Sequence, residues 1–222
     1  MLYHLLYPLR DHFSGFNVFK YITFRSAGAV LTALIVSFVF GKPMIAWLRR
    51  LKVGQQVRDD GPQSHLTKQG TPTMGGLLII VALAGSALLW SDLTNKYVWV
   101  VLLATLAFGA IGFWDDYLKV VKKRSTGLRA LEKFGLQIAA ALAVGFFLFY
   151  NPSDPKSTYL SVPFMKNVLI DLGWFYIPFV VVVIVGSSNA VNLTDGLDGL
   201  AIGLVGIAAT ANAVLVYLGG NR

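Results

Sequence analysis

Long apolar stretches alternate with short polar ones along most of this chain. About 20 consecutive apolar residues are enough to cross a bilayer as a helix. The pattern therefore predicts six membrane-spanning helices, at roughly residues 22–40, 73–90, 97–114, 132–150, 173–191 and 199–218. We expect an all-α integral membrane protein, organised as one polytopic membrane domain over residues 1–222.

Three segments outside these stretches differ in character. Residues 1–16 mix aromatic and polar side chains, which suits a segment at the membrane interface. Residues 151–163 contain three prolines and several polar residues, so this loop is expected to leave the membrane core. For residues 164–172 we expect a short interfacial helix.

The positions of Lys and Arg predict an orientation. Loops 41–70 and 115–133 hold six of them each, whereas loop 91–96 holds one and segment 151–172 holds two. Because Lys and Arg gather in cytoplasmic loops, the two rich loops are predicted to be cytoplasmic and the N-terminus to lie outside. Counting spans puts the polar stretch near 192–198 on the cytoplasmic side as well.

Composition also indicates a membrane protein rather than a soluble one. Of the 222 residues, 55% are hydrophobic and 14% are charged, whereas a soluble domain has roughly 25% charged residues. The formal net charge of +8 comes from loops between apolar stretches, so it reflects membrane topology rather than nucleic-acid binding. The chain has no cysteine, which excludes a disulfide framework and a thiolate metal site.

Two adjacent carboxylates, Asp115 and Asp116, follow directly on the apolar stretch 97–114. Acidic residues at the edge of a membrane span are costly, which makes them candidates for function. Mg²⁺ is usually held by one or two carboxylates together with substrate phosphates, and the nearby Lys119 and Lys123 suit phosphate. The alternative is that this run only caps a helix end at a lipid surface.

A second polar stretch contains Asn192, Asp195 and Asp198, which recur at every third position. On a helix this spacing brings side chains near one face. Gly196 and Gly199 either break the helix or let the backbone approach a flat ligand. The alternative is a simple polar turn between two spans.

A third polar stretch runs from Arg58 to Gly76, and counting spans puts it at the same membrane face as the other two. The beginning of a helix accounts for Thr71 and Pro72. It does not account for Lys68, which is either a phosphate partner or an ordinary cytoplasmic loop cation.

The three stretches carry a family resemblance. The residues concerned are Asp60–His65 with Lys68–Gly76, then Gly112–Tyr117, then Asn189–Ala201. Together they resemble the polyprenyl-phosphate N-acetylhexosamine-1-phosphate transferases, and within that superfamily the phospho-N-acetylmuramoyl-pentapeptide transferases. The resemblance covers essentially the whole chain.

The resemblance implies a reaction at the cytoplasmic face of the bacterial inner membrane. Phospho-N-acetylmuramoyl-pentapeptide moves from its UDP carrier, UDP-MurNAc-pentapeptide, to undecaprenyl phosphate, which gives lipid I and UMP as a step of peptidoglycan synthesis. The cofactor implied is Mg²⁺. The other partners implied are membrane lipids and a second copy in a homodimer, with no nucleic acid.

The resemblance also implies site residues. Asp115 and Asp116 would be catalytic, and Asn192 and Asp115 would hold the metal. Substrate would be bound by a larger set that comprises Lys68, Thr73, Lys119, Lys123, Lys133, Asp195, Gly196, Leu197 and Asp198.

The chain departs from the family in length, since the family has about ten spans. It is therefore expected to be an N-terminal portion that lacks a third catalytic aspartate. Two alternatives remain open: a sister transferase acting on UDP-N-acetylglucosamine, and an inactive membrane fragment. A transporter or channel is a further rival, but it predicts polar residues near the middle of the spans.

Overall fold

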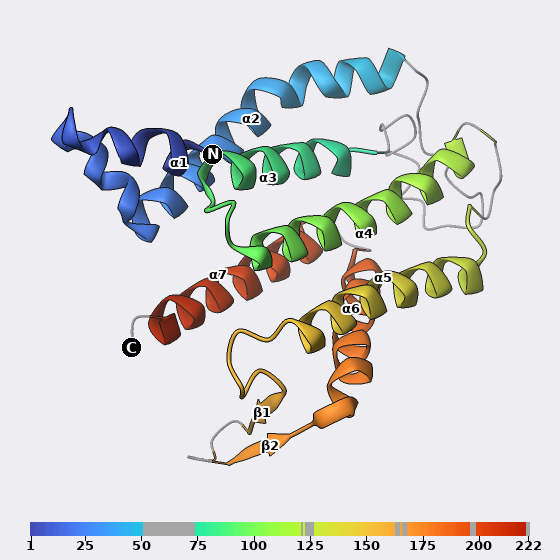
Figure 1. Ribbon diagram of the computed structural model, residues 1–222. Helices are drawn as coiled ribbons and strands as arrows, with labels where there is room; N and C mark the ends of the chain where they lie inside the picture. The colour runs from blue at the N-terminus through green and yellow to red at the C-terminus, as the bar shows by residue number, and fades with distance from the viewer. Residues whose placement is uncertain are drawn as a thin grey trace. The chain divides into compact units, whose positions relative to one another are not determined.

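The structure is a computed structural model, in which residues 51–73 and several shorter stretches are left undescribed (Figure 1). The described residues are 1–50, 74–120, 122, 127–162, 165, 168–195 and 199–220. They form two compact units, residues 1–136 and 137–222. We describe each unit by itself, and the expectation of a single membrane domain stays a prediction.

The described chain is almost entirely helical. Its order is α1 (Leu2–Leu6), the 3-10 helices η1 (Tyr7–Asp11) and η2 (Ser14–Lys20), α2 (Ile22–Arg50), α3 (Gly76–Trp90), α4 (Lys96–Val120), α5 (Ala130–Tyr150), β1 (Tyr159–Ser161), β2 (Leu169–Asp171), η4 (Gly173–Phe175), α6 (Tyr176–Thr194) and α7 (Leu200–Gly220).

In the first unit, α2 and α3 lie side by side in opposite directions (Figure 1). The Trp90 indole N–H at the end of α3 donates a 2.9 Å hydrogen bond to Thr32 Oγ1 near the start of α2. Gly28 lies directly beneath the Trp90 ring, where any larger residue would collide with the indole. A glycine at this position therefore allows the two helices to approach closely.

The N-terminal segment is attached to the same end of α3. The Met1 ammonium group donates to the carbonyl oxygens of Leu88 and Ser91, at 3.0 and 3.2 Å. His4 Nε2 lies 3.1 Å from Asp92 Oδ1 in the short turn that precedes α4. Asp115 lies 19 positions after Lys96, the first residue of α4, so about 28 Å of helix separates it from this turn.

In the second unit, the C-terminal part of α5 packs on α6. Gly145 is buried against the backbone and side chain of Ile177. Gln137, which is 4% exposed, accepts a 2.9 Å hydrogen bond from Asn189 Nδ2 on α6. Because lipid offers no hydrogen-bond partners, a paired amide of this kind is the expected arrangement inside a membrane protein.

Five helices of the described residues are long and apolar enough to span a membrane: α2, α4, α5, α7 and a segment that comprises η4 and α6. The remaining predicted span, 73–90, is the shorter helix α3, whose 15 residues measure about 22 Å. Many of the large apolar side chains are exposed, Phe38 at 78% and Ile207 at 70% for example. Such surfaces suit lipid, and the predicted class of all-α membrane protein is confirmed.

The structure corrects three local predictions. The span predicted over 22–40 continues as helix to Arg50, through Pro43. Residues 169–171 are not helical but form strand β2, which pairs antiparallel with β1. The predicted span 97–114 extends to Val120, so Asp115 and Asp116 lie inside α4 rather than after it.

Candidate active site

The C-terminal end of α4 carries the two adjacent carboxylates. Consecutive residues on a helix point about 100° apart, so Asp115 and Asp116 face different surroundings. Asp115 is only 7% exposed, whereas Asp116 is half-buried. The two acids of one dipeptide therefore occupy different environments.

Asp115 is held by hydrogen bonds to both of its oxygens. Lys119 Nζ donates to Oδ2 at 2.7 Å, and the backbone N–H of Leu128 donates to Oδ1 at 2.8 Å. Lys133 Nζ from α5 lies 3.8 Å from Oδ2. We call these four residues, Asp115, Lys119, Leu128 and Lys133, the Asp115 cluster.

The local sequence explains how the cluster forms. Lys119 is placed one helical turn after Asp115, a spacing at which side chains on a helix meet. The turn that brings Leu128 to Asp115 passes through Gly127, whose φ is +61°. This left-handed conformation is one that glycine adopts readily and most other residues avoid.

The start of α5 fixes the other side of this turn. The Arg129 N–H donates to Glu132 Oε2 at 3.2 Å, and the Arg129 carbonyl accepts from the Lys133 N–H at 3.0 Å. An acid three residues after the helix boundary commonly satisfies a free N–H in this way. The turn is thus tied to α4 by Leu128 and to α5 by Glu132.

Asp116 differs from its neighbour in its contacts. Within the described part of the chain, its side chain makes no hydrogen bond or ion pair. A half-buried carboxylate with no partner among the described residues can accept a proton, a metal ion or a donor from a ligand.

The two predicted residues near the end of α6 have a different setting. Asn192 lies in the last turn of α6 and Asp195 follows the helix as its C-cap, and both are exposed. Among the described residues of the second unit, neither side chain makes a hydrogen bond or ion pair. The helix ends after Thr194, so the predicted three-residue spacing on one face of a helix does not extend to Asp195.

The remaining predicted site residues lie outside the described residues. They are Lys68, Thr73, Lys123, Gly196, Leu197 and Asp198. Of the predicted set, the structure brings Lys119 and Lys133 to Asp115, with Asp116 adjacent to it. The functional role of each predicted residue stays a prediction.

The donor set of the α4 end fits a hard divalent cation such as Mg²⁺. Each carboxylate oxygen has two lone pairs, so the single hydrogen bond to each Asp115 oxygen leaves room for another interaction. Asp116 adds a carboxylate with no protein partner among the described residues. No group of three or more His, Cys, Asp or Glu side chains gathers among these residues, but Mg²⁺ commonly binds one or two carboxylates and completes its shell with water and phosphate.

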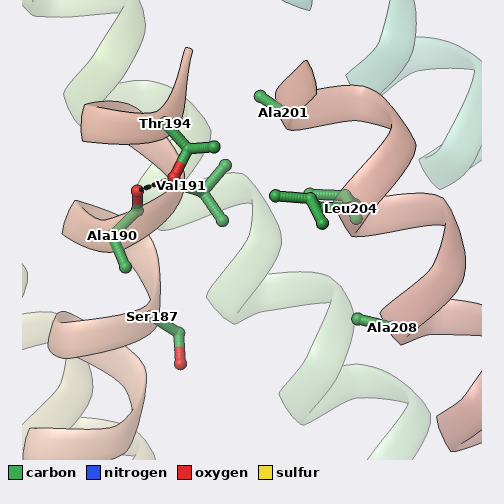
Figure 2. Close-up of a pocket in the computed structure, with 8 residues that line it drawn as sticks. Ser187, Ala190, Val191, Thr194, Ala201, Leu204 and Ala208 are labelled. Carbon is green, nitrogen blue, oxygen red and sulfur yellow. Dashed lines mark hydrogen bonds between the residues drawn. The ribbon is translucent and has the colours of Figure 1, made fainter. Parts of the chain in front are cut away.

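An apolar pocket of ≈ 310 Å³ lies between α6 and α7 (Figure 2). Its lining is Ser187, Ala190, Val191, Thr194, Ala201, Leu204, Val205 and Ala208. The Thr194 hydroxyl is directed to the Ala190 carbonyl at 2.8 Å, as the dashed line in Figure 2 shows. None of the predicted site residues that the structure describes lines this pocket, and its described lining is mostly apolar, which does not suit a phosphate.

Leu128 and Gly127 were not among the predicted residues. Leu128 contributes a backbone N–H, which any residue except proline provides, so its identity carries no signal. The available signal was Gly127 just before a helix with an acid in its first turn. That pattern marks a tight turn but does not reveal which side chain the turn meets.

Comparison with known proteins places the chain in a family. The sequence profile of glycosyl transferase family 4 matches residues 98–222. Signature 1 of phospho-N-acetylmuramoyl-pentapeptide-transferase matches residues 68–80. The chain therefore belongs to glycosyl transferase family 4, a family of transferases.

Individual relatives agree with this assignment. Proteins named phospho-N-acetylmuramoyl-pentapeptide-transferase from Thermodesulfovibrio yellowstonii and Desulfotalea psychrophila are 54% and 55% identical over 221 residues. Each alignment covers 100% of this chain and 61% of the relative. The predicted resemblance is confirmed, and the chain spans about 61% of the length of these relatives.

Proposed function

We propose that the protein of which this sequence forms at least a part transfers phospho-N-acetylmuramoyl-pentapeptide from its UDP carrier to undecaprenyl phosphate. The observation that carries the proposal is the Asp115 cluster, which puts a buried carboxylate and two lysines at the end of a membrane-length helix. The names of the relatives supply the sugar and peptide part of the substrate.

The chemistry suits such a site. An oxygen of the lipid phosphate attacks the phosphorus that carries the sugar, and the bond from that phosphorus to the UMP oxygen breaks. The products are lipid I, with a new diphosphate, and UMP. Both substrates are anionic, so catalysis depends mostly on positioning and on neutralising negative charge.

The described residues take distinct roles in this proposal. Lys119 and Lys133 lie at the carboxylate cluster and would also attract substrate phosphate. Either Asp115 or Asp116 would accept the proton of the lipid phosphate if the phosphate arrives protonated. A Mg²⁺ ion held by Asp115 and Asn192, with Asp116 as a further candidate, would supply neutralisation of the diphosphate charge.

The undescribed residues complete the proposed site. Lys68, Thr73 and Lys123 would contact the nucleotide phosphates together with Asp195. The uracil base would lie against a segment that consists of Gly196, Leu197 and Asp198. These assignments come from the family resemblance.

We also propose the membrane location. The site would face the cytoplasm of a bacterial inner membrane, with the N-terminus outside, because counting spans predicts that the Lys- and Arg-rich loops 41–70 and 115–133 share one side. In the first unit the N-terminus lies near the turn before α4, and Asp115 lies near the other end of α4. This separation supports opposite membrane faces for the two features. Membrane lipids and a second copy of the chain would be its further partners.

The test is release of UMP by the purified full-length gene product in lipid nanodiscs. With UDP-MurNAc-pentapeptide, undecaprenyl phosphate and Mg²⁺, we expect UMP and lipid I in equal amounts, and neither after chelation of the metal. Use of UDP-N-acetylglucosamine alone would instead identify the sister transferase. Absence of UMP release with either nucleotide would refute a transferase function.

A further inference from the structure

We propose that Gly127 is a positioning residue for Asp115. Its backbone conformation and its lack of a Cβ allow the Leu128 N–H to reach Asp115 Oδ1 while Lys119 reaches Oδ2. The consequence for catalysis rests on the proposed function, whereas the positioning of the carboxylate does not.

The first observation is conformational. Gly127 has φ +61°, in the left-handed region where a Cβ is strained against its own backbone. The next residue, Leu128, directs its N–H at a carboxylate that is 7% exposed. A change of φ at Gly127 would rotate the following peptide group and remove this donor.

The second observation is steric and independent of φ. A Cβ built on Gly127 would lie 2.6 Å from Lys119 Cε, and closer still to Asp115 Oδ1. Real Cβ atoms do not approach other atoms so closely, so both the Asp115 carboxylate and the end of the Lys119 side chain would have to move. A side chain at this position therefore displaces both members of the ion pair.

The third observation is that the turn has little freedom to adapt. The Arg129 N–H is bonded to Glu132 and the Arg129 carbonyl to the Lys133 N–H, which fixes the turn to the start of α5. Lys133 itself contributes a second ammonium group to Asp115. Any movement of the turn away from α4 would therefore also disturb that contact.

The chain provides a matched control at Gly173. This glycine has φ +46°, also left-handed, but nothing lies within 4 Å of a Cβ built there. Asparagine tolerates the left-handed conformation better than other residues with a Cβ. Comparing Gly127→Asn with Gly173→Asn thus separates the steric effect on Asp115 from the backbone effect.

In the full-length gene product, we expect Gly127→Asn to lower kcat by about 100-fold, as misplacement of a catalytic group by about 1 Å can do. KM for the UDP substrate should rise as well, because the substitution also disturbs Lys119, which the proposed function places at the substrate phosphate. Gly173→Asn should leave kcat and KM unchanged. Equal kcat for Gly127→Asn and wild type would overturn the proposal.

A readout apart from activity is carboxyl labelling with a water-soluble carbodiimide and glycine ethyl ester, mapped by mass spectrometry on this chain in nanodiscs. Asp115 should label several-fold faster in Gly127→Asn than in wild type or in Gly173→Asn. If the wild-type protein released no UMP but this labelling difference appeared, the proposed function would fail and the positioning role would stand.

A second variant keeps the test decisive if Gly127→Asn does not fold. Glu132 is exposed and Glu132→Ala removes only the acceptor for the Arg129 N–H. We expect a smaller rise in Asp115 labelling, together with a small fall in the thermal midpoint because the first turn of α5 loses its acid. Unchanged labelling of Asp115 in Glu132→Ala would contradict a fixed turn that holds this carboxylate.

Discussion

The C-terminal ends of α4 and α6 both carry acidic or amide side chains, but they are stabilised differently. At α4, Asp115 is buried, and the last turn of the helix contains a basic residue, Lys119. At α6, Asn192 and Asp195 are exposed, and the last turn has no basic residue. The negative end of a helix dipole disfavours a carboxylate, so each site must offset that cost in its own way.

The difference indicates two kinds of polar site. At α4 the chain itself supplies the donors, through Lys119, Lys133 and the Leu128 N–H, so the carboxylate is oriented before any ligand binds. At α6, no side chain among the described residues supplies such donors to Asn192 or Asp195. We therefore expect mutations at α4 to change stability and activity together, and mutations at α6 to change activity alone.

The largest effect should come from removing the acids themselves. Asp115→Asn in the full-length gene product should reduce UMP release by about 10³-fold, in the range found when one stabilising group is removed from an active site. It should also lower the thermal midpoint, because Lys119 and Lys133 then lack their shared anion. Asp195→Asn should reduce UMP release with an unchanged midpoint.

Two measurements on the same preparations test this prediction: thermal unfolding followed by intrinsic fluorescence, and the rate of UMP release. Asp11→Asn is a suitable control, since Asp11 is exposed and lies in the N-terminal segment. If Asp195→Asn lowered the thermal midpoint as much as Asp115→Asn does, the proposed difference between the C-terminal ends of α4 and α6 would be wrong.

The next effect concerns the two lysines of the Asp115 cluster. Lys119 hydrogen-bonds Asp115 at 2.7 Å, whereas Lys133 lies 3.8 Å away, beyond hydrogen-bond distance. Lys119→Met should therefore destabilise the protein more than Lys133→Met, by about 1–2 kcal/mol for loss of a charge-assisted bond. Chemical denaturation in detergent measures the difference, and Lys122→Met, which lies outside the cluster, is the control. A larger effect for Lys133→Met would contradict the geometry.

A smaller effect tests what stabilises α6 away from its polar end. Gln137→Leu removes the acceptor for Asn189 Nδ2, which keeps only its bond to the Val185 carbonyl at 2.8 Å. Buried side-chain hydrogen bonds between membrane helices contribute about 0.6–2 kcal/mol. Reversible unfolding in mixed micelles should show a loss in this range, whereas Asn212→Leu on the exposed face of α7 should show none. Equal losses of stability for the two variants would contradict a stabilising role for the hydrogen bond between Gln137 and Asn189.

The smallest effect lies at the other end of α4. Thr94 donates two hydrogen bonds to Asp92, which together with the nearby His4 hold the pKa of that carboxyl below its ordinary 3.8. A carboxylate with a lowered pKa in the folded state stabilises the fold above its unfolded pKa, and this contribution disappears as pH falls through the folded value. Asp92→Asn should thus lower the thermal midpoint slightly at pH 7, and the difference from wild type should shrink as the pH falls below 3.8. A difference that grew as the pH fell would contradict this sign.

The sequence predicted the spans and the acid pair but not the way the pair is held. Apolar length alone located the helices within a few residues, except at the C-terminal ends of α2 and α4, which continue to Arg50 and Val120. The Leu128 contact was not predictable, because it depends on a backbone N–H and on how the turn folds. The extension of α2 through Pro43 was missed since proline is a poor but not absolute helix terminator.

The β1–β2 hairpin was missed for a related reason. Residues 169–171 become a strand only because Tyr159, Leu160 and Ser161 pair with them, and pairing across a loop leaves no periodic signal in three residues. The local pattern of apolar residues therefore predicts the long helices. The short elements and the geometry of the site depend on contacts between segments that are distant in the sequence.

The contrast between the ends of α4 and α6 has one direct test, the rate of carboxyl labelling in the wild-type chain. Water-soluble carbodiimide with glycine ethyl ester is applied to the chain in nanodiscs without substrate or metal, and labelling is followed by mass spectrometry. We predict that Asp195 labels several-fold faster than Asp115, since Asp115 is buried and hydrogen-bonded at both oxygens. Equal rates, or faster labelling of Asp115, would contradict the conclusion that the chain itself orients this carboxylate.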